Sequence, residues 1–167
     1  MSASADTGRA WTFGDRIDTD VLAPGALMKL APEALAQHCL KAVSPQFAQE
    51  VQAGDFIVAG RSFGIGSSRE QAAVSLRILG VRAVLAKSFA RIFYRNALNL
   101  GLPALFFEQA DEIADGDRLA LDLRAGTLTN VTSGQTYTVS PIPDHLLGII
   151  EAGGLAPYLK RKAERGA

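Results

Sequence analysis

The sequence predicts an α/β fold that combines parallel strand–helix–strand units with a small antiparallel part. Two short apolar runs, at residues 56–59 and 81–86, flank a segment with helical spacing, and short strands on either side of one helix favour a parallel crossover. A second segment with helical character, residues 90–100, is followed by an apolar run at 103–107. From Asp111 onward apolar residues alternate with polar ones, which is the period of strands with one buried face.

The first part of the chain predicts shorter elements. Residues 1–10 are small and polar without periodicity, so we expect a disordered tail before a single domain at 11–167. Residues 11–22 start as a strand and then pass into a turn. A helix is expected over 32–41, because a proline stands at its start, and a helical turn over 45–51.

A glycine-rich loop, residues 60–71, reads GRSFGIGSSREQ and separates the first apolar run from the next helix. Ser67 as N-cap with Glu70 three positions later forms a capping box. Gly80 is the residue expected to end this helix. The apolar face of the helix recurs at Ala72, Ala73, Leu76 and Leu79.

The C-terminal part predicts hairpins followed by helix. Glycines separate the alternating segments, which we expect to form strands at residues 119–123, 127–131 and 135–139. Residues 143–162 have helical character and are interrupted at Gly153 and Gly154.

The composition is that of an ordinary globular protein. Hydrophobic residues make up 48% and charged residues 20% of the 167 residues, and the formal net charge is +0. This balance gives no basic surface for nucleic acid or an anionic membrane. No apolar run approaches 18 residues and the N-terminus lacks a signal-peptide core, so we expect a cytoplasmic protein with no nucleic-acid or membrane partner.

The cysteine count limits the metal chemistry. Cys39 is the only cysteine, so the chain forms no internal disulfide and no cysteine-ligated cluster. His38 and His145 show no ligand spacing, and we assign no metal ligand to this chain. Cys39 as a nucleophile is the less favoured interpretation, because small buried thiols in helices are common.

The glycine loop fits none of three common glycine motifs. A dinucleotide fingerprint needs a third glycine where Arg69 stands, and an acid near Lys87. A phosphate-binding P-loop needs Gly-Lys-Ser/Thr at the helix start. A nucleophile elbow needs Gly-x-Ser-x-Gly, which neither Ser67 nor Ser68 satisfies.

An anion site remains. Free N–H groups at a helix start, the helix dipole and the Arg69 guanidinium all favour a carboxylate or phosphate. The same field stabilises an alkoxide on a neighbouring serine, which could then act as a base without histidine. The alternative is that Ser67 is only a cap and Arg69 only a surface charge.

Several ordered motifs carry a family resemblance. They are Asp18-Thr19-Asp20 and the segments at residues 64–71, 86–96 and 151–155. Together they resemble the swivel domain of the aconitase superfamily, and within it the small subunits of 3-isopropylmalate dehydratase. The resemblance extends over residues 14–162.

The resemblance implies a swivelling β/β/α fold and a hydro-lyase that is active only with a large subunit. It implies that the large subunit carries a [4Fe–4S] cluster, with no cofactor on this chain. The reaction would isomerise 2-isopropylmalate to 3-isopropylmalate in leucine biosynthesis. By the same resemblance Ser67 is the base, Arg69 binds a substrate carboxylate, Ser68 contacts substrate and Asp20 is an active-site acid. A turn-capping role for Asp18 and Asp20 is the alternative.

Two departures bear on the substrate, a 2-hydroxy dicarboxylate. Family members often have cysteine where Ile65 stands, which should alter loop packing. The resemblance implies that the loop at residues 24–29 contacts the variable arm of the substrate. Leu27 and Met28 suit an isopropyl group, whereas Lys29 could meet a carboxylate or point to solvent. The alternatives are a small subunit of homoaconitase or dimethylmalate dehydratase type, and a non-catalytic module that binds carboxylate or phosphate.

Overall fold

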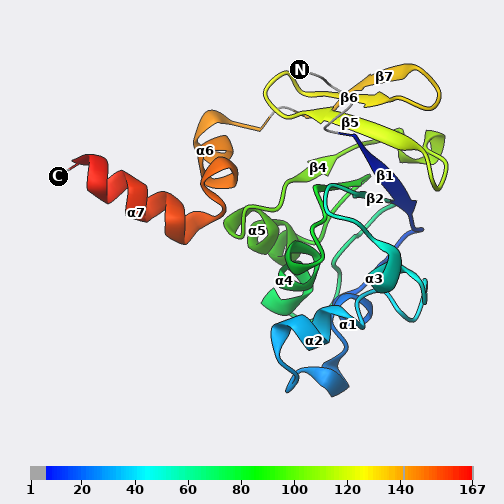
Figure 1. The fold of residues 1–167 in the computed structure, drawn as a ribbon, viewed down its shortest axis with the longest axis horizontal. Helices are drawn as coiled ribbons and strands as arrows, with labels where there is room; N and C mark the ends of the chain where they lie inside the picture. Colours follow the sequence, from blue (N-terminus) through cyan, green and yellow to red (C-terminus); the bar gives the residue numbers. More distant parts are fainter. Residues whose placement is uncertain (1–6, 141, 167) are drawn as a thin grey trace.

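The computed structural model describes residues 7–140 and 142–166, and its strands form one seven-stranded sheet of order β4-β3-β2-β1-β5-β6-β7 (Figure 1). Strands β1 to β4 are parallel, whereas β5 pairs antiparallel with β1 and the remaining pairs are antiparallel hairpins. The predicted mixed α/β fold is confirmed. The strands are β1 Thr7–Thr12, β2 Phe56–Ala59, β3 Ala83–Ala86, β4 Ala104–Phe106, β5 Arg118–Asp122, β6 Thr127–Asn130 and β7 Gln135–Thr138.

Two helices connect the parallel strands, α4 after β2 and α5 after β3. Gly80 follows α4 in the left-handed conformation, φ +85°, and ends that helix as expected. The C-terminal helices α6 and α7 divide at Gly153, and α7 extends away from the sheet (Figure 1). The helices are α1 Thr19–Leu22, α2 Pro32–Ala36, α3 Phe47–Glu50, α4 Glu70–Ile78, α5 Arg91–Asn99, α6 Asp144–Ala152 and α7 Leu155–Gly166, with 3₁₀ turns η2 Gly25–Leu27 and η3 Ala110–Glu112.

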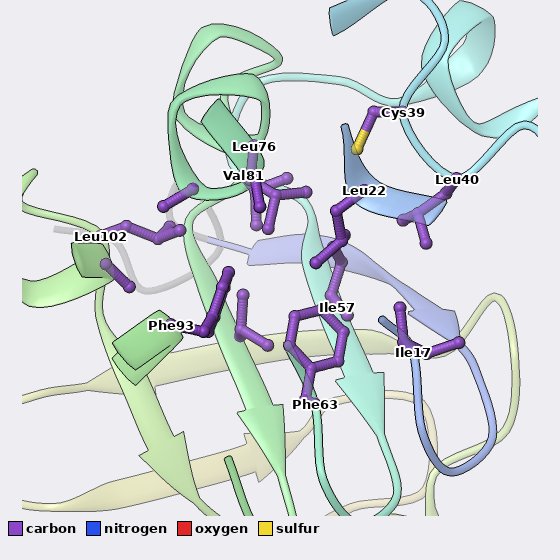
Figure 2. Close-up of a cluster of buried hydrophobic side chains, with 14 of the residues drawn as sticks. Ile17, Leu22, Cys39, Leu40, Ile57, Phe63, Leu76, Val81, Phe93 and Leu102 are labelled. Carbon is purple, nitrogen blue, oxygen red and sulfur yellow. The ribbon is translucent and has the colours of Figure 1, made fainter. Parts of the chain in front are cut away.

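The parallel strands are buried on both faces. Along β2, Ile57 and Ala59 join a core cluster with residues of the helices, whereas Phe56 and Val58 join a second cluster on the opposite face. Figure 2 shows part of the first cluster, in which Leu22, Cys39, Leu40 and Leu76 gather with Ile57 over the strands.

The second cluster explains why the sheet carries an antiparallel half. Leu85 of β3 and Leu128 of β6 belong to one buried cluster, although three strands separate them in the sheet. The sheet therefore curls over its own face, and β5–β7 cover the side of the parallel strands that α4 and α5 leave open. Leu147 of α6 closes the same cluster.

The expected disordered tail is wrong for residues 7–10, which belong to β1. Thr7 and Gly8 pair with Ala120 and Leu119 of β5, more than 100 residues later. The segment has no apolar periodicity because its backbone, rather than its side chains, makes these contacts. Residues 1–6 lie outside the described residues.

The helix expected over 32–41 is also shorter than predicted. It ends at Ala36, and the chain then turns through Leu40 at φ +61°. Leu40 is fully buried, and its N–H donates to the carbonyl of Val21 at 2.9 Å. Burial of this side chain therefore ends the helix where propensity alone would continue it.

Candidate active site

Three of the four motif segments, at residues 18–20, 64–71 and 86–96, meet beyond the carboxyl ends of the parallel strands. On one side of the glycine loop, Gly64 N–H donates to Ile17 at 2.7 Å, and Thr19 N–H donates to Ile65 at 2.9 Å. On the other side, Ala90 N–H donates to the Phe63 carbonyl at 2.9 Å. Ligands of open α/β sheets bind at this edge, so the loop stands where the fold places a site.

Gly64 is required by the close approach of α5. Its φ is +85°, and a Cβ at this position would lie 2.3 Å from the Cβ of Phe93. Phe93 is buried and meets the ring of Phe63 edge-on, with centroids 5.1 Å apart (Figure 2). The first turn of α5 therefore packs directly on the loop backbone, which fixes the loop and the helix relative to each other.

The predicted capping box of Ser67 and Glu70 is wrong. Helix α4 begins at Glu70, its N-cap is Arg69, and no side chain caps it. The loop backbone is held by its bonds to residues 17–19 as far as Ile65, and Gly66 then continues at φ +113°, so the helix starts later than expected. Ser67 and Ser68 are both exposed, and the Ser67 hydroxyl is not used as a cap.

Arg69 and Asp20 form an ion pair. Arg69 Nη1 lies 2.9 Å from Asp20 Oδ1 and also donates to the Ala23 carbonyl at 3.1 Å. The Arg69 side chain is 22% exposed and that of Asp20 69%. Gly25 makes room for the arginine, because a Cβ there would come within 3.0 Å of Arg69 Nη2.

The turn-capping role expected of Asp18 and Asp20 is confirmed. Asp18 caps α1 by accepting from Val21 N–H at 2.8 Å. Asp20 accepts from Gly25 N–H at 2.8 Å, and this hydrogen bond, followed by that from Arg69, lowers the pKa of the Asp20 carboxyl below its usual value. Asp20 therefore stabilises a turn and also holds the arginine of the loop.

A hollow of about 330 Å³ opens beside this ion pair. Ser67 and Arg69 line it from the loop, and Arg91 and Asn96 line it from α5. Arg91 and Asn96 were not predicted as site residues, although both lie in the motif at residues 86–96. The packing of α5 on the loop brings them to the hollow, and this tertiary contact leaves no local signal in the sequence. The remaining lining residues are Thr19, Gly64, Ile65, Gly66, Ala90, Ile92 and Phe93.

The loop at residues 24–29, which we expect to contact the variable arm of the substrate, lies only partly at the site. Leu27 lines a second hollow of about 320 Å³, which also contains Asp20. Leu27 and Met28 are half-buried and pack against the core of the helical face. Lys29 is exposed and makes no ion pair within residues 7–140 and 142–166. The structure thus brings Leu27 into a hollow that also holds a predicted site residue, whereas Met28 and Lys29 are not among the described residues that line these two hollows.

The described residues do not supply a ligand set for a metal cluster. Cys39 is fully buried, and burial raises the pKa of its thiol. No group of three histidine, cysteine, aspartate or glutamate side chains gathers within the described part of the chain. Among the same residues, no helix combines the length and apolar character needed to cross a membrane.

Comparisons with known proteins agree with the fold and the motifs. A family model described as the aconitase C-terminal domain matches residues 37–110. The 3-isopropylmalate dehydratase small subunit 1 of Archaeoglobus fulgidus is 50% identical over 159 residues, covering 95% of this chain and 99% of the relative. The methanogen homoaconitase small subunit of Methanothermobacter thermautotrophicus is 47% identical over 161 residues, 95% of this chain and 93% of the relative.

A solved structure is similar over nearly the whole fold. The crystal structure of 3-isopropylmalate dehydratase from Methanocaldococcus jannaschii superposes with a TM-score of 0.90 at 42% identity, covering 96% of both chains. Identity at this level over this length is shared by proteins of one family. The chain therefore belongs to the aconitase C-terminal domain family, in the group formed by the small subunits of 3-isopropylmalate dehydratase and homoaconitase.

Proposed function

We propose that this chain is the small subunit of a two-subunit hydro-lyase that interconverts 2-isopropylmalate and 3-isopropylmalate in leucine biosynthesis. The observation that carries the proposal is the placement of Ser67 and Arg69 in one hollow beyond the parallel strands. The name of the Archaeoglobus fulgidus relative, which is 50% identical, supports the same substrate.

In this proposal the Ser67 hydroxyl, as its alkoxide, removes a proton from the substrate carbon next to the one that bears the hydroxyl. The hydroxyl then leaves as hydroxide and the alkene forms, so that this hydroxide and the proton held by Ser67 together make up the water that is lost. Re-addition places the hydroxyl on the carbon that lost the proton and returns the proton to the neighbouring carbon. The positive charge of Arg69 favours the alkoxide, because a nearby opposite charge stabilises the charged form of an acid. The exposed Ser67 side chain is accessible for this role.

Arg69 retains donors for a substrate carboxylate. Its bonds to Asp20 and Ala23 both use Nη1, which leaves Nη2 and Nε without a hydrogen-bond partner among the described residues. A guanidinium binds a carboxylate through two parallel N–H donors, and these two nitrogens form such an edge. Asp20 holds the guanidinium in place during binding.

The rest of the active site belongs to a large subunit in this proposal. The described residues do not fit an iron–sulfur cluster, so a [4Fe–4S] cluster would be carried by that subunit. Bound there, the cluster would supply a Lewis acid for the substrate hydroxyl. This chain contributes the base, a carboxylate partner and the Leu27 side of the site.

The experiment is an assay of the chain purified with its large subunit and an anaerobically reconstituted cluster, on a panel of 2-hydroxy acids that includes 2-isopropylmalate and homocitrate. We expect isopropylmalate to be turned over most efficiently. Turnover of homocitrate with no turnover of isopropylmalate would contradict the substrate assignment and favour the homoaconitase type. The methanogen homoaconitase small subunit is 47% identical to this chain.

Ser67→Ala separates an enzyme from a module that only binds carboxylate or phosphate. An enzyme should lose kcat by about 100-fold to 10,000-fold, the range for removal of a general base, while the subunits still assemble. A binding module would show only a modest change in affinity. Ser133→Ala, at an exposed turn between β6 and β7, is the control and should leave kcat unchanged.

A further inference from the structure

Two polar residues of α5 line the hollow that holds Ser67 and Arg69. Arg91 is exposed and Asn96 is half-buried, and both line the same space. Within residues 7–140 and 142–166, Arg91 makes no ion pair and the Asn96 amide makes no hydrogen bond. Their polar groups are therefore available to a ligand in the hollow.

The charge of the hollow suits a dianion. Arg69 and Arg91 are among its lining residues, and no acidic residue is. Asp20, which neutralises part of the Arg69 charge, lines the second hollow instead. A 2-hydroxy diacid carries two carboxylates, and the free donor edge of Arg69 can bind only one of them.

The loop that carries Ser67 and Arg69 and the helix that carries Arg91 and Asn96 are held in fixed positions relative to each other. Ala90, the residue before Arg91, is bonded through its N–H to the loop carbonyl of Phe63, and Phe93 fills the space above Gly64. Arg91 and Asn96 are thus carried on a helix that is packed directly on the loop of Ser67. Side chains on such a rigid element can orient a substrate against the base.

We propose that Arg91 and Asn96 are further substrate-binding residues. The Arg91 guanidinium pairs with the carboxylate of the 2-hydroxy diacid that Arg69 does not bind, and the Asn96 amide donates a hydrogen bond to the same ligand. This inference rests on the proposed function for the identity of the ligand, and it names the residues that complete the site on this chain.

Matched variants on the same helix test the proposal in the two-subunit enzyme with 2-isopropylmalate. Arg91→Gln should raise KM about tenfold or more, since a charge-assisted hydrogen bond is lost. Arg95→Gln removes the same charge from an exposed position of α5 that does not line the hollow, and should leave KM within twofold. Asn96→Ala should raise KM in the same way, with Asn99→Ala as its control.

A binding measurement gives a readout independent of turnover. Malate, as the probe, is titrated into the full chain while the side-chain amide of Asn96 and the Nε–H of Arg91 are followed by NMR. We expect both signals to shift, and Arg91→Gln to weaken malate binding about tenfold relative to Arg95→Gln. Arg91→Lys keeps the charge without the planar fork and should lie between wild type and Arg91→Gln.

The two possible failures are distinguishable. If the wild-type enzyme turns over no 2-hydroxy diacid, the proposed function fails, and the malate titration still decides whether Arg91 and Asn96 bind a diacid. If isopropylmalate is turned over but Arg91→Gln and Arg95→Gln have the same KM and the same malate affinity, the inference is overturned and the proposed function stands.

Discussion

Asp20 and Arg69 are 49 residues apart in the sequence, and the 2.9 Å contact between Asp20 Oδ1 and Arg69 Nη1 joins the first motif of the chain to the glycine loop. The same carboxylate oxygen accepts from Gly25 N–H. One acidic side chain therefore connects the loop of the proposed base to the turn that leads to Leu27.

Asp20→Asn tests this connection. The amide keeps an oxygen for Gly25 N–H but removes the charge opposite Arg69, so the guanidinium should lose its fixed position. We expect kcat/KM to fall about tenfold, whereas the stability should change little because the Asp20 side chain is largely exposed. Steady-state kinetics and thermal unfolding measure the two effects, and a large loss of stability with unchanged kinetics would contradict a positioning role.

The protonation state of Asp20 gives a pH prediction. Its pKa is lowered, first by the Gly25 hydrogen bond and then by Arg69, so the carboxylate loses its proton below the ordinary value of 3.8. A depressed pKa in the folded state contributes stability above the unfolded pKa, and this contribution is lost as the pH falls through the folded value. Between pH 5 and 8, roughly the range of an activity assay, the ion pair should therefore be constant.

Carboxyl-carbon NMR of Asp20 measures this titration. We expect a midpoint below 3.8 that moves up in Arg69→Gln without reaching the ordinary value, since the larger cause, the Gly25 hydrogen bond, remains. A midpoint above 3.8 in the wild type would show that the Gly25 hydrogen bond and Arg69 do not stabilise the Asp20 carboxylate.

Gly64→Ala should destabilise the chain more than a similar change at Gly134. Both glycines have a left-handed backbone, φ +85° and +83°, but a Cβ at Gly134 meets nothing within 4 Å, whereas one at Gly64 meets Phe93. Gly134→Ala should cost about 1–2 kcal/mol for conformation alone, and Gly64→Ala a further 1–3 kcal/mol or so for the clash. Urea unfolding measures the difference, and equal losses would mean that α5 is not packed tightly on the loop.

The substrate loop gives a prediction about specificity. Leu27 lies beside Asp20 in the second hollow, so Leu27→Ala should lower kcat/KM for isopropylmalate by about 10-fold to 200-fold, the range for lost apolar contacts in a pocket. Lys29 is exposed, and Lys29→Met should leave that value within twofold. If Lys29→Met instead alters turnover of homocitrate, the lysine meets a carboxylate and the substrate assignment must change.

Strong local patterns were sufficient for most of the fold. The apolar run at β2 and the helical spacing at α5 predicted both elements nearly to the residue, because burial on both faces and caps leave clear signals. β1 was missed over residues 7–10 because its pairing comes from β5, which is distant in sequence. Such a contact leaves no local periodicity.

The candidate site was predictable where chemistry is local in sequence. Ser67 and Arg69 are two residues apart in the loop, and both line one hollow in the structure. The start of α4 was wrong because hydrogen bonds to residues 17–19 hold the loop extended, and these are tertiary contacts. Arg91 and Asn96 were missed for the same reason, since only packing at Gly64 turns α5 toward the loop.

Strand β1 lies between the parallel and the antiparallel halves of the sheet, with β2 on one side and β5 on the other. The composition of residues 1–10 suggests that a shortened chain could begin at residue 11. Such a chain would lack most of β1, the strand that joins the two halves of the sheet. The edges of β2 and β5 would then be left with unpaired backbone groups, which recruit other chains. Residues 7–10 of β1 thus protect the backbone edges of β2 and β5 from pairing with other chains.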